Sequence, residues 1–416
     1  MHVNRVYDVE TPYTLCYQNN DESVSVYIFP VPISYRNSNG ELELINASLT
    51  DVMDNNRKDR FALQSETGVV TSLYPHNLKG NFLVVKDAKT MISFTVDYGQ
   101  SVEYKKTVFR DYLGCERDSV SYTLDGEIDL QCVPVSFGMK SVFTIQKPIN
   151  NGTISFLLDK QAINDIENNG NNIIITPKDD MSQRCVIRCS YFEDSTGKLG
   201  FIDRITVRET TDTVECIIPA NEAFLARNDI FYPVSFSVSF EVLPDSMQTV
   251  NTYTNSGTDY LSDYSVIGSD EHYGNSAMFM KFRIGHFLKT YKQNVKSASL
   301  SFVNMVCGKT FSTIRFERLN KWWNTNTPFD EMPESTDTIH NVYITDTGQY
   351  KVDITEYIRF CIHDDTLNTE NYGMVVSSAE GSSTIISNYN NALYPPYVRI
   401  DFYDMPWKFE KVDEIN

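Results

Sequence analysis

The sequence predicts an all-β protein built from tandem β-sandwich domains. Tyr and Phe number 25 and 24 among 416 residues, against 3 Trp, and aromatic and β-branched residues favour strands. Strand-like runs recur along the chain and are separated by residues that form tight turns. Typical turn pairs are Asn39-Gly40, Asp125-Gly126 and Asn151-Gly152.

Ten segments carry a clear strand pattern. The last of them, Ser235–Val242, alternates Ser or Glu with Phe or Val, which predicts one buried face and one face in water. In chain order the segments are Ser23–Phe29, Asn81–Val85, Met91–Val96, Val142–Ile145, Thr153–Leu158, Asn172–Thr176, Arg184–Tyr191, Ile202–Arg208, Thr213–Ile218 and Ser235–Val242.

Helical pattern is scarce. Asp159–Asn168 is predicted as a short helix that begins at an Asp159 cap. In Val352–Ile362 an isoleucine recurs at every fourth position, which predicts a short amphipathic helix capped by Asp353 or Thr355.

The length predicts more than one domain, because a single core rarely grows beyond about 300 residues. A polar stretch follows Leu243-Pro244-Asp245, and the main junction is placed there. The predicted division is residues 1–245, with a weaker boundary near 150–172, then a jelly-roll domain at 246–404 and a tail at 405–416.

The charge balance excludes several partners. Lys and Arg total 36 and Asp and Glu total 55, a formal net charge of −19. Nucleic acid is not expected as a partner, because phosphate binding requires clusters of basic residues. No run of apolar residues is long enough to predict a membrane span. The start has no signal-peptide pattern, so we expect a leaderless route to the cell surface or the medium, assembly in the cytoplasm, or a longer parent product.

Sequence motifs for catalysis are missing. The six histidines are isolated, and no nucleophile-elbow, P-loop or dinucleotide-binding pattern occurs. Cys185 and Cys189 have no second pair of ligands for zinc, so both are expected to be buried free thiols. The sequence therefore predicts a protein that is not an enzyme, although paired carboxylates that meet in space cannot be recognised from spacing.

Two adjacent tryptophans are the strongest candidates for ligand binding. If Trp322 and Trp323 lie on a strand, one ring enters the core and the other can reach solvent. An exposed indole beside the amides of Asn324 and Asn326 suits a sugar ring, whose C–H face is apolar and whose hydroxyls need polar partners. The alternative is that both rings pack inside the protein.

A calcium site is the second candidate. Asp259, Asp263 and Asp270 offer the hard oxygen ligands that Ca²⁺ prefers, but their spacing is not that of an EF-hand. The alternative is that these carboxylates are solvated loop residues. Calcium is therefore a possible cofactor.

The segment from Asp245 to Tyr403 resembles the DNRLRE domain family. This resemblance implies a jelly roll of the carbohydrate-binding type with one short helix. It rests on Asp259-Tyr260, Tyr273-Gly274-Asn275, Met278–Ile284, Val295–Phe302, Arg318–Pro333, Val352–Thr355, Asn371–Gly373, Pro395–Tyr397 and Phe402-Tyr403.

The upstream part resembles the β region that precedes such domains in bacterial surface and YD-repeat (Rhs-type) toxin proteins. The matching segments are Val26–Leu49, Phe192–Asp203 and Phe224–Ser237. Together the resemblances imply a non-catalytic scaffold that attaches to a glycan or cell surface, with a protein partner or larger assembly also possible. The alternatives are a structural component of a phage-like or contractile particle and a polysaccharide-active enzyme.

Overall fold

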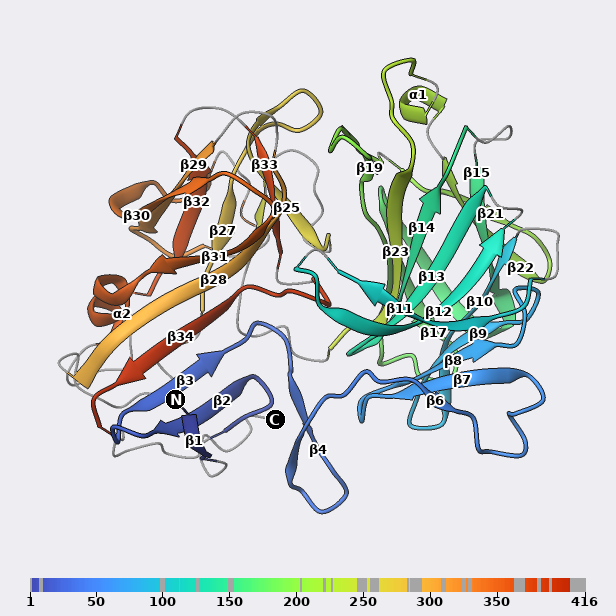
Figure 1. Ribbon diagram of the computed structural model, residues 1–416, viewed down its shortest axis with the longest axis horizontal. Coiled ribbons are helices and arrows are strands. Elements are labelled where there is room, and N and C mark those ends of the chain that lie inside the picture. The colour runs from blue at the N-terminus through green and yellow to red at the C-terminus, as the bar shows by residue number, and fades with distance from the viewer. Residues whose placement is uncertain are drawn as a thin grey trace. The chain divides into compact units, whose positions relative to one another are not determined.

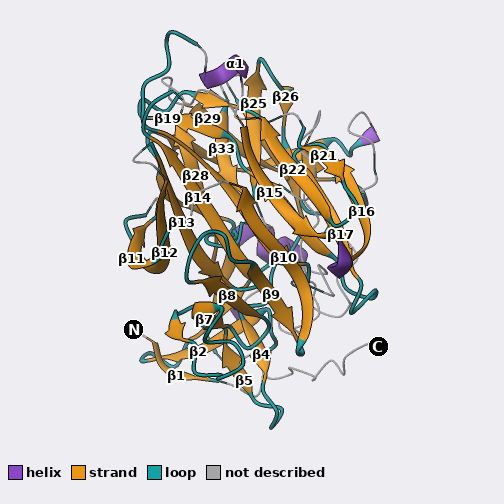
Figure 2. Ribbon diagram, turned by 90° about the vertical axis from the view of Figure 1, so that its right-hand side faces the viewer, coloured by secondary structure: helices purple, strands orange, loops and turns teal. Residues whose placement is uncertain are grey.

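The computed structural model describes residues 2–404, apart from 7–9, 98–101, 112, 125–126, 149–152, 203, 220–221, 226, 245–252, 255–261, 283, 285–293, 308–311, 324–326, 328–330, 363–370, 380–382 and 389–390. Strands dominate it, and the helices are few and short (Figure 2). All strand pairs within the sheets are antiparallel. The predicted all-β class with sandwich-like sheets is confirmed.

The chain forms two compact units. The composite unit contains residues Met1–Leu44 and Ser246–Asn416, and the inserted unit contains Ile45–Asp245. The second unit boundary coincides with the predicted junction, but the predicted grouping of residues 1–245 differs from the structure. Residues 1–44 join the C-terminal part because their strands complete its sheet, and the weaker boundary near 150–172 falls inside the inserted unit. The predicted tail at 405–416 lies outside the described residues.

The larger sheet of the composite unit unites the two ends of the chain. Val24, Val26 and Ile28 of β3 lie opposite Phe402, Ile400 and Val398 of β34, and Figure 1 shows the two strands side by side. The described strands run in the order β1 (His2–Arg5), β2 (Thr14–Asn19), β3 (Val24–Ile28), β34 (Tyr397–Phe402), β28 (Val295–Cys307), β33 (Thr384–Ser387), β25 (Tyr264–Asp270) and β26 (Gly274–Ser276), with β31 (Gly348–Asp353) paired to β28.

The second sheet of the composite unit faces the same core. Alternate residues of its strands, such as Met278, Met280 and Phe316, join Val26 and Ile400 of the larger sheet in one buried cluster. This sheet contains β24 (Tyr253–Thr254), β27 (Met278–Met280), β32 (Met374–Ser378), β29 (Ser312–Leu319) and β30 (Ser335–Ile344), and a separate hairpin is formed by β4 (Ser34–Arg36) and β5 (Leu42–Leu44). The arrangement is a sandwich; its predicted jelly-roll connectivity stays a prediction.

The helix predicted in the composite unit is present as α2 (Thr355–Cys361). Ile354, Ile358 and Ile362 are buried as their spacing predicts. The cap differs from the prediction, because Ile354 occupies the cap position. Asp353 lies one residue earlier, and its Oδ1 accepts hydrogen bonds from the Thr355 backbone N–H at 2.9 Å and the Thr355 hydroxyl at 2.6 Å. It thereby satisfies one of the backbone donors that a helix start leaves without a partner.

The inserted unit is a second sandwich with an aromatic core. Phe94 and Phe240 come from opposite sheets and stack with ring centroids 3.7 Å apart, and Phe143 stacks on Phe236. One sheet runs β21 (Thr206–Glu209), β22 (Thr213–Pro219), β15 (Thr153–Asp159), β10 (Lys89–Asp97), β9 (Phe82–Lys86), β8 (Thr71–Pro75), β7 (Phe61–Glu66) and β6 (Thr50–Asp51). The other runs β11 (Lys105–Arg110), β12 (Glu116–Leu124), β13 (Ile128–Val135), β14 (Gly138–Ile145), β23 (Val234–Val242), β18 (Cys185–Cys189), β17 (Asn172–Pro177) and β16 (Ile163–Asn169), with β19 (Phe192–Asp194) and β20 (Leu199–Gly200) beside β23, and a short helix α1 (Glu222–Leu225) completes the unit.

The helix predicted at Asp159–Asn168 is wrong beyond its first turn. Only Lys160–Ala162 form a 3-10 turn, and Asp159 caps it by accepting a hydrogen bond from the Gln161 backbone N–H at 2.9 Å. The following residues form β16, which pairs with β17. The tertiary pairing of this edge strand overrides the weak local helical preference.

The water-facing side predicted for β23 is also wrong. Ser237, Ser239 and Glu241 are buried. Polar partners make this burial possible: the Ser237 backbone N–H donates to the Ser190 hydroxyl at 2.7 Å. Glu241 forms an ion pair with Arg188 at 2.8 Å, and each side chain is at most 6% exposed. Alternation of polar and apolar residues therefore reports a strand here but not its exposure to water.

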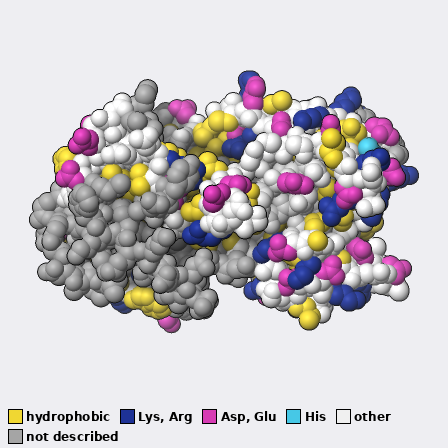
Figure 3. Space-filling view, turned by 90° about the horizontal axis from the view of Figure 1, so that it is seen from below, with side chains coloured by type: hydrophobic (Ala, Val, Ile, Leu, Met, Phe, Trp, Pro, Cys, Tyr) yellow, Lys and Arg dark blue, Asp and Glu magenta, His cyan; other side chains and the backbone are white. Residues whose placement is uncertain are grey.

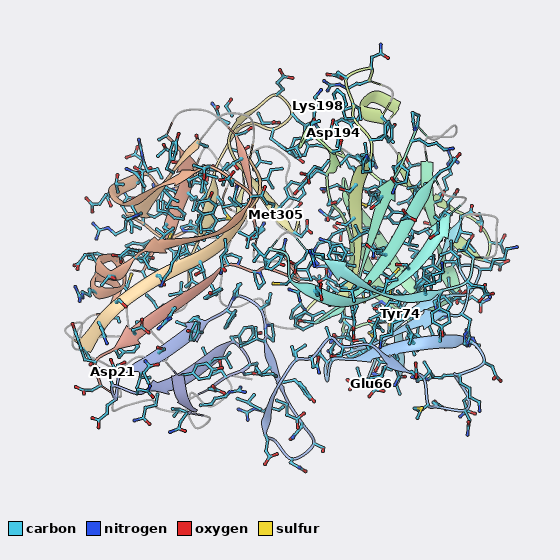
Figure 4. The ribbon with its side chains drawn as sticks, in the orientation of Figure 1. Asp21, Glu66, Tyr74, Asp194, Lys198 and Met305 are labelled. Atoms are coloured by element: carbon cyan, nitrogen blue, oxygen red, sulfur yellow. The ribbon has the colours of Figure 1, made fainter. Side chains whose placement is uncertain are left out.

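Two segments that carry the upstream resemblance meet in a turn of the inserted unit. Asp194 Oδ1 accepts hydrogen bonds from the Thr196 and Lys198 backbone N–H groups at 2.8 and 2.9 Å, and its Oδ2 accepts one from the Phe231 N–H at 3.0 Å. Burial raises the pKa of Asp194, but these bonds outweigh it and hold the pKa below its usual range. Figure 4 labels Asp194 and Lys198 at this turn. The acidic turn thus ties β19 to the loop that precedes β23.

Candidate functional site

Trp323 anchors the loop that follows β29. Its side chain is 2% exposed, and its ring meets Phe279 edge-on with centroids 5.9 Å apart. Leu319 and Val375 complete this cluster. Phe279 alternates with the inward-facing Met278 and Met280 of β27, so the Trp323 ring covers the outer side of the smaller sheet of the composite unit.

The segment Asn371-Tyr372-Gly373 holds this anchor in place. The Trp323 indole N–H donates to the Tyr372 carbonyl at 2.7 Å, and the Leu319 N–H donates to the Gly373 carbonyl at 3.1 Å. Gly373 has a positive φ of 95°, and a Cβ atom there would lie 2.4 Å from the Met280 carbonyl oxygen. Only glycine permits this approach. The Asn371 amide donates to the Phe282 carbonyl at 2.7 Å, so the motif is a structural support for the tryptophan loop.

Trp322 lies in the opposite environment. Its side chain is 64% exposed, immediately beside the buried Trp323. Of the two arrangements predicted for the pair, this is the one in which a ring is available to bind a ligand. The two residues lie in the loop after β29, not on a strand as that prediction assumed. Asn324 and Asn326, the amides predicted to assist, lie outside the described residues.

A surface hollow of about 500 Å³ opens beside the tryptophan loop. Asn320 and Lys321, the two residues before Trp322, line one side of it, and Glu331, Met332 and Glu334 line the other. Met332 also packs against the Trp323 cluster. Polar hydrogen-bonding groups therefore line this hollow, and two of its residues directly precede the exposed indole of Trp322.

A second hollow of about 660 Å³ lies beside α2. Arg318 at the end of β29, Asp337 and His340 on β30, and Asp353 and Arg359 around α2 contribute to its lining. The Arg318 guanidinium lies 3.9 Å from the centroid of the Phe360 ring. In the sequence, Asp353 is a predicted helix cap and Arg318 begins a motif. No local pattern indicates the groove, because its walls come from segments far apart in the chain.

Two of the three proposed calcium ligands lie far apart. Asp263 precedes β25 and Asp270 ends it, so their Cα atoms are about 23 Å apart at the usual rise of a strand. Asp270 Oδ1 accepts a hydrogen bond from the His272 N–H at 2.8 Å, and Asp263 is buried. Asp259 lies outside the described residues. Within the described part of the chain, no group of three or more His, Cys, Asp or Glu residues could hold a metal ion.

The described cysteines include both members of the predicted pair. Cys185 and Cys189 are both buried thiols outside any disulfide, as expected. Burial raises the pKa of the Cys185 thiol to about 12. A thiol with so high a pKa stays protonated at neutral pH and is a poor nucleophile.

The surface charges agree with the composition. On the face shown in Figure 3, basic side chains are interspersed with acidic ones. Among the described residues, no helix has both the length and the apolar character needed to cross a bilayer.

Comparisons with known proteins identify no family. No family model and no curated protein matches the chain. Among solved structures, a heparinase III matches with a TM-score of 0.17 and 8% identity over 65% of this chain, and the match spans 39% of the heparinase chain. An exo-β-1,3-galactanase from Phanerochaete chrysosporium, solved with galactose, matches with a TM-score of 0.16 and 8% identity over 95% of both chains. Likenesses this weak carry no argument, and the resemblances to the DNRLRE and YD-repeat-associated regions stay predictions.

Proposed function

We propose that the composite unit binds a glycan without catalysis, with Trp322 as the stacking platform. The single observation that carries the proposal is the contrast between the two rings: Trp323 is 2% exposed and Trp322 is 64% exposed. A solvent-exposed indole beside polar side chains offers a flat apolar surface on which the C–H face of a sugar ring can stack.

The hollow beside Trp322 supplies the polar part of such a site. Asn320, Lys321, Glu331 and Glu334 offer donors and acceptors of the kind that sugar hydroxyls need. Asn324 and Asn326 lie outside the described residues and stay predicted contacts of the ligand. The protein would then serve as an attachment scaffold of a bacterial surface or toxin-delivery system, which is the context that the resemblances imply.

Rigidity supports binding by this loop. The Trp323 indole is fixed by its hydrogen bond to Tyr372 and its contact with Phe279. A platform that is already ordered loses little conformational entropy when a ligand arrives.

The test is a glycan array followed by titration calorimetry on the polysaccharides that bind. Trp322→Ala is expected to weaken binding about 10-fold or more, since stacking and burial of an indole contribute about 1.5–3 kcal/mol. The matched control is Tyr403→Ala, which removes an aromatic ring that is 53% exposed at the end of β34. Absence of any glycan ligand for the wild-type chain, or equal binding by both variants and wild type, would overturn the proposal.

A catalytic site is the second candidate, because Glu331 and Glu334 line the same hollow and glycosidases use paired carboxylates. The polysaccharides that bind should be incubated with the protein and assayed for new reducing ends. Release that disappears in the Glu331→Gln and Glu334→Gln variants would replace the binding proposal with an enzymatic one.

A further inference from the structure

The groove beside α2 plays no part in the proposed tryptophan site, although it is the larger of the two hollows described above. Its volume of about 660 Å³ lies in the range of sites that hold small ligands. Ile339 and the Phe360 ring add apolar surface to the polar side chains of the lining. Apolar patches framed by hydrogen-bonding side chains are the chemistry that sugar rings require.

The Lys and Arg side chains that line the groove are already paired with acidic residues. Lys296 contacts Asp21 at 2.9 Å, and Arg359 contacts Glu356 at 2.7 Å. Arg318 forms an ion pair with Asp337. A carboxylate or sulfate on a ligand would have to displace one of these acids, whereas hydroxyl groups can bond to the paired groups without separating them.

Some residues that line the two hollows lie near each other at one end of the paired strands β29 and β30. Arg318 lines the groove, and Asn320, two residues further along, lines the hollow beside Trp322. On the other strand, Asp337 lines the groove and Glu334 lines the tryptophan hollow. The pairing of Leu319 with Ser335 lies between these two sets and keeps them close together.

We propose that the binding site continues from Trp322 across the Arg318–Asp337 pair into the groove beside α2. The ligand is then an extended, uncharged chain of several sugar units that is held along its length and not only at its end. This inference rests on the proposed function, because it assigns a ligand class to the site that Trp322 begins. The groove residues bind the units that lie beyond the stacked ring.

The experiment measures affinity against chain length. Titration calorimetry is run with linear neutral oligosaccharides of two to six units from three ladders: β-1,4-linked glucose, β-1,4-linked mannose and α-1,4-linked glucose. Oligogalacturonates of the same lengths serve as the acidic comparison. Wild-type affinity should rise about tenfold or more from the shortest to the longest neutral chain of one ladder, because added units gain contacts in the groove.

A groove-blocking variant and its control separate the two hollows. Thr338 is exposed and lines the groove, whereas Asn341 is exposed on the same strand and does not line it. Thr338→Trp should reduce the affinity of the longest chain to that of the shortest and leave the shortest unchanged. Asn341→Trp should behave as wild type, and Trp322→Ala should weaken chains of every length.

Several outcomes overturn the inference. Affinity independent of chain length, equal effects of Thr338→Trp and Asn341→Trp, or tighter binding of oligogalacturonates would each sink it. In those cases sensitivity to Trp322→Ala would leave the proposed function standing. If no neutral ladder binds the wild-type chain, the inference fails, and an empty glycan array would remove the proposed function as well.

Discussion

The two units of this protein differ in how their cores are assembled from the chain. The inserted unit is continuous, from Ile45 to Asp245, whereas the composite unit joins residues 1–44 to residues 246–416. Both are antiparallel sandwiches with comparable buried clusters. Similar folds can therefore be built from the chain in different ways. All strands of the inserted unit come from one continuous segment, whereas the composite unit depends on a pairing between strands from the two ends of the chain.

The pairing of β3 with β34 is the feature whose loss should have the largest effect. Val26 is 2% exposed and faces Ile400 across the sheet. Val26→Asp buries an unpaired charge, which is expected to cost about 4 kcal/mol or more. We expect residues 246–404 to become protease-sensitive while Ile45–Asp245 stays protected, as mapped by limited proteolysis and mass spectrometry.

The control is the same substitution at Val108, which is 55% exposed on β11. Val108→Asp should leave both units protected. Protection of residues 246–404 in the Val26→Asp variant would contradict the view that the N-terminal strands are required for the composite core.

A substitution in the aromatic core of the inserted unit should destabilise that unit and leave the composite unit unchanged. Phe240→Ala removes the ring that stacks on Phe94 at 3.7 Å. The expected loss is about 3–5 kcal/mol in the unfolding free energy of the inserted unit. Hydrogen exchange read by mass spectrometry in increasing denaturant should show earlier opening of β10 and β23 and unchanged opening of β3 and β34. Equal shifts in both sets of strands would show that the units unfold as one.

The two units should also differ in how their stability depends on pH. Burial, with a smaller contribution from Asp194, raises the pKa of Glu193 to about 7, above its ordinary value of 4.5. A carboxyl whose pKa is raised by folding contributes stability that is fully present below pH 4.5 and is lost as the pH rises through 7. The difference is on the order of 3 kcal/mol.

We therefore expect the inserted unit to unfold more easily at pH 8 than at pH 5, and Glu193→Gln to remove most of that difference in denaturant titrations. The exposed Glu167→Gln is the control; Glu167 has a side chain that is 56% exposed. An unchanged pH dependence in Glu193→Gln would refute the assignment.

The composite unit should show the opposite pH dependence, with the smallest effect. Hydrogen bonds from Thr355 hold the pKa of Asp353 below its ordinary value of 3.8. A lowered pKa contributes stability that is present at neutral pH and is lost in acid. Asp353→Ala is expected to lower the unfolding free energy by about 0.5–2 kcal/mol at pH 7, as for other helix-start residues, and to flatten its fall in acid. Asp346→Ala, at an exposed loop position, should change neither quantity.

Much of the local structure could be predicted because it depends on residues close in sequence. Alternation and turn residues located β9, β10, β17 and β22 to within a few residues, and the isoleucine spacing located α2. The sequence left two arrangements open for the adjacent tryptophans, and the structure has the one with a buried Trp323 and an exposed Trp322. The DNRLRE resemblance also drew attention to Asn371–Gly373, but its role as a support for Trp323 needed coordinates.

Other features were beyond the reach of local pattern. Ser237 and Glu241 are buried although the alternation of β23 predicts a wet face, because their polar partners come from other segments. The groove beside α2 gathers side chains from β28, β29, β30 and α2. Each of its charged residues, taken alone, resembles an ordinary surface charge.

Local sequence pattern is enough to predict the all-β class, the positions of several strands, the helix at Thr355–Cys361 and the pair of tryptophans that define the candidate site. The grouping of residues 1–44 with residues 246–416, and the gathering of distant side chains around the groove beside α2, are visible only in the folded chain. Strands pair through backbone hydrogen bonds, which are nearly the same for every residue. The sequence of a strand therefore does not predict which strand it pairs with. The partner follows from the packing of the whole core.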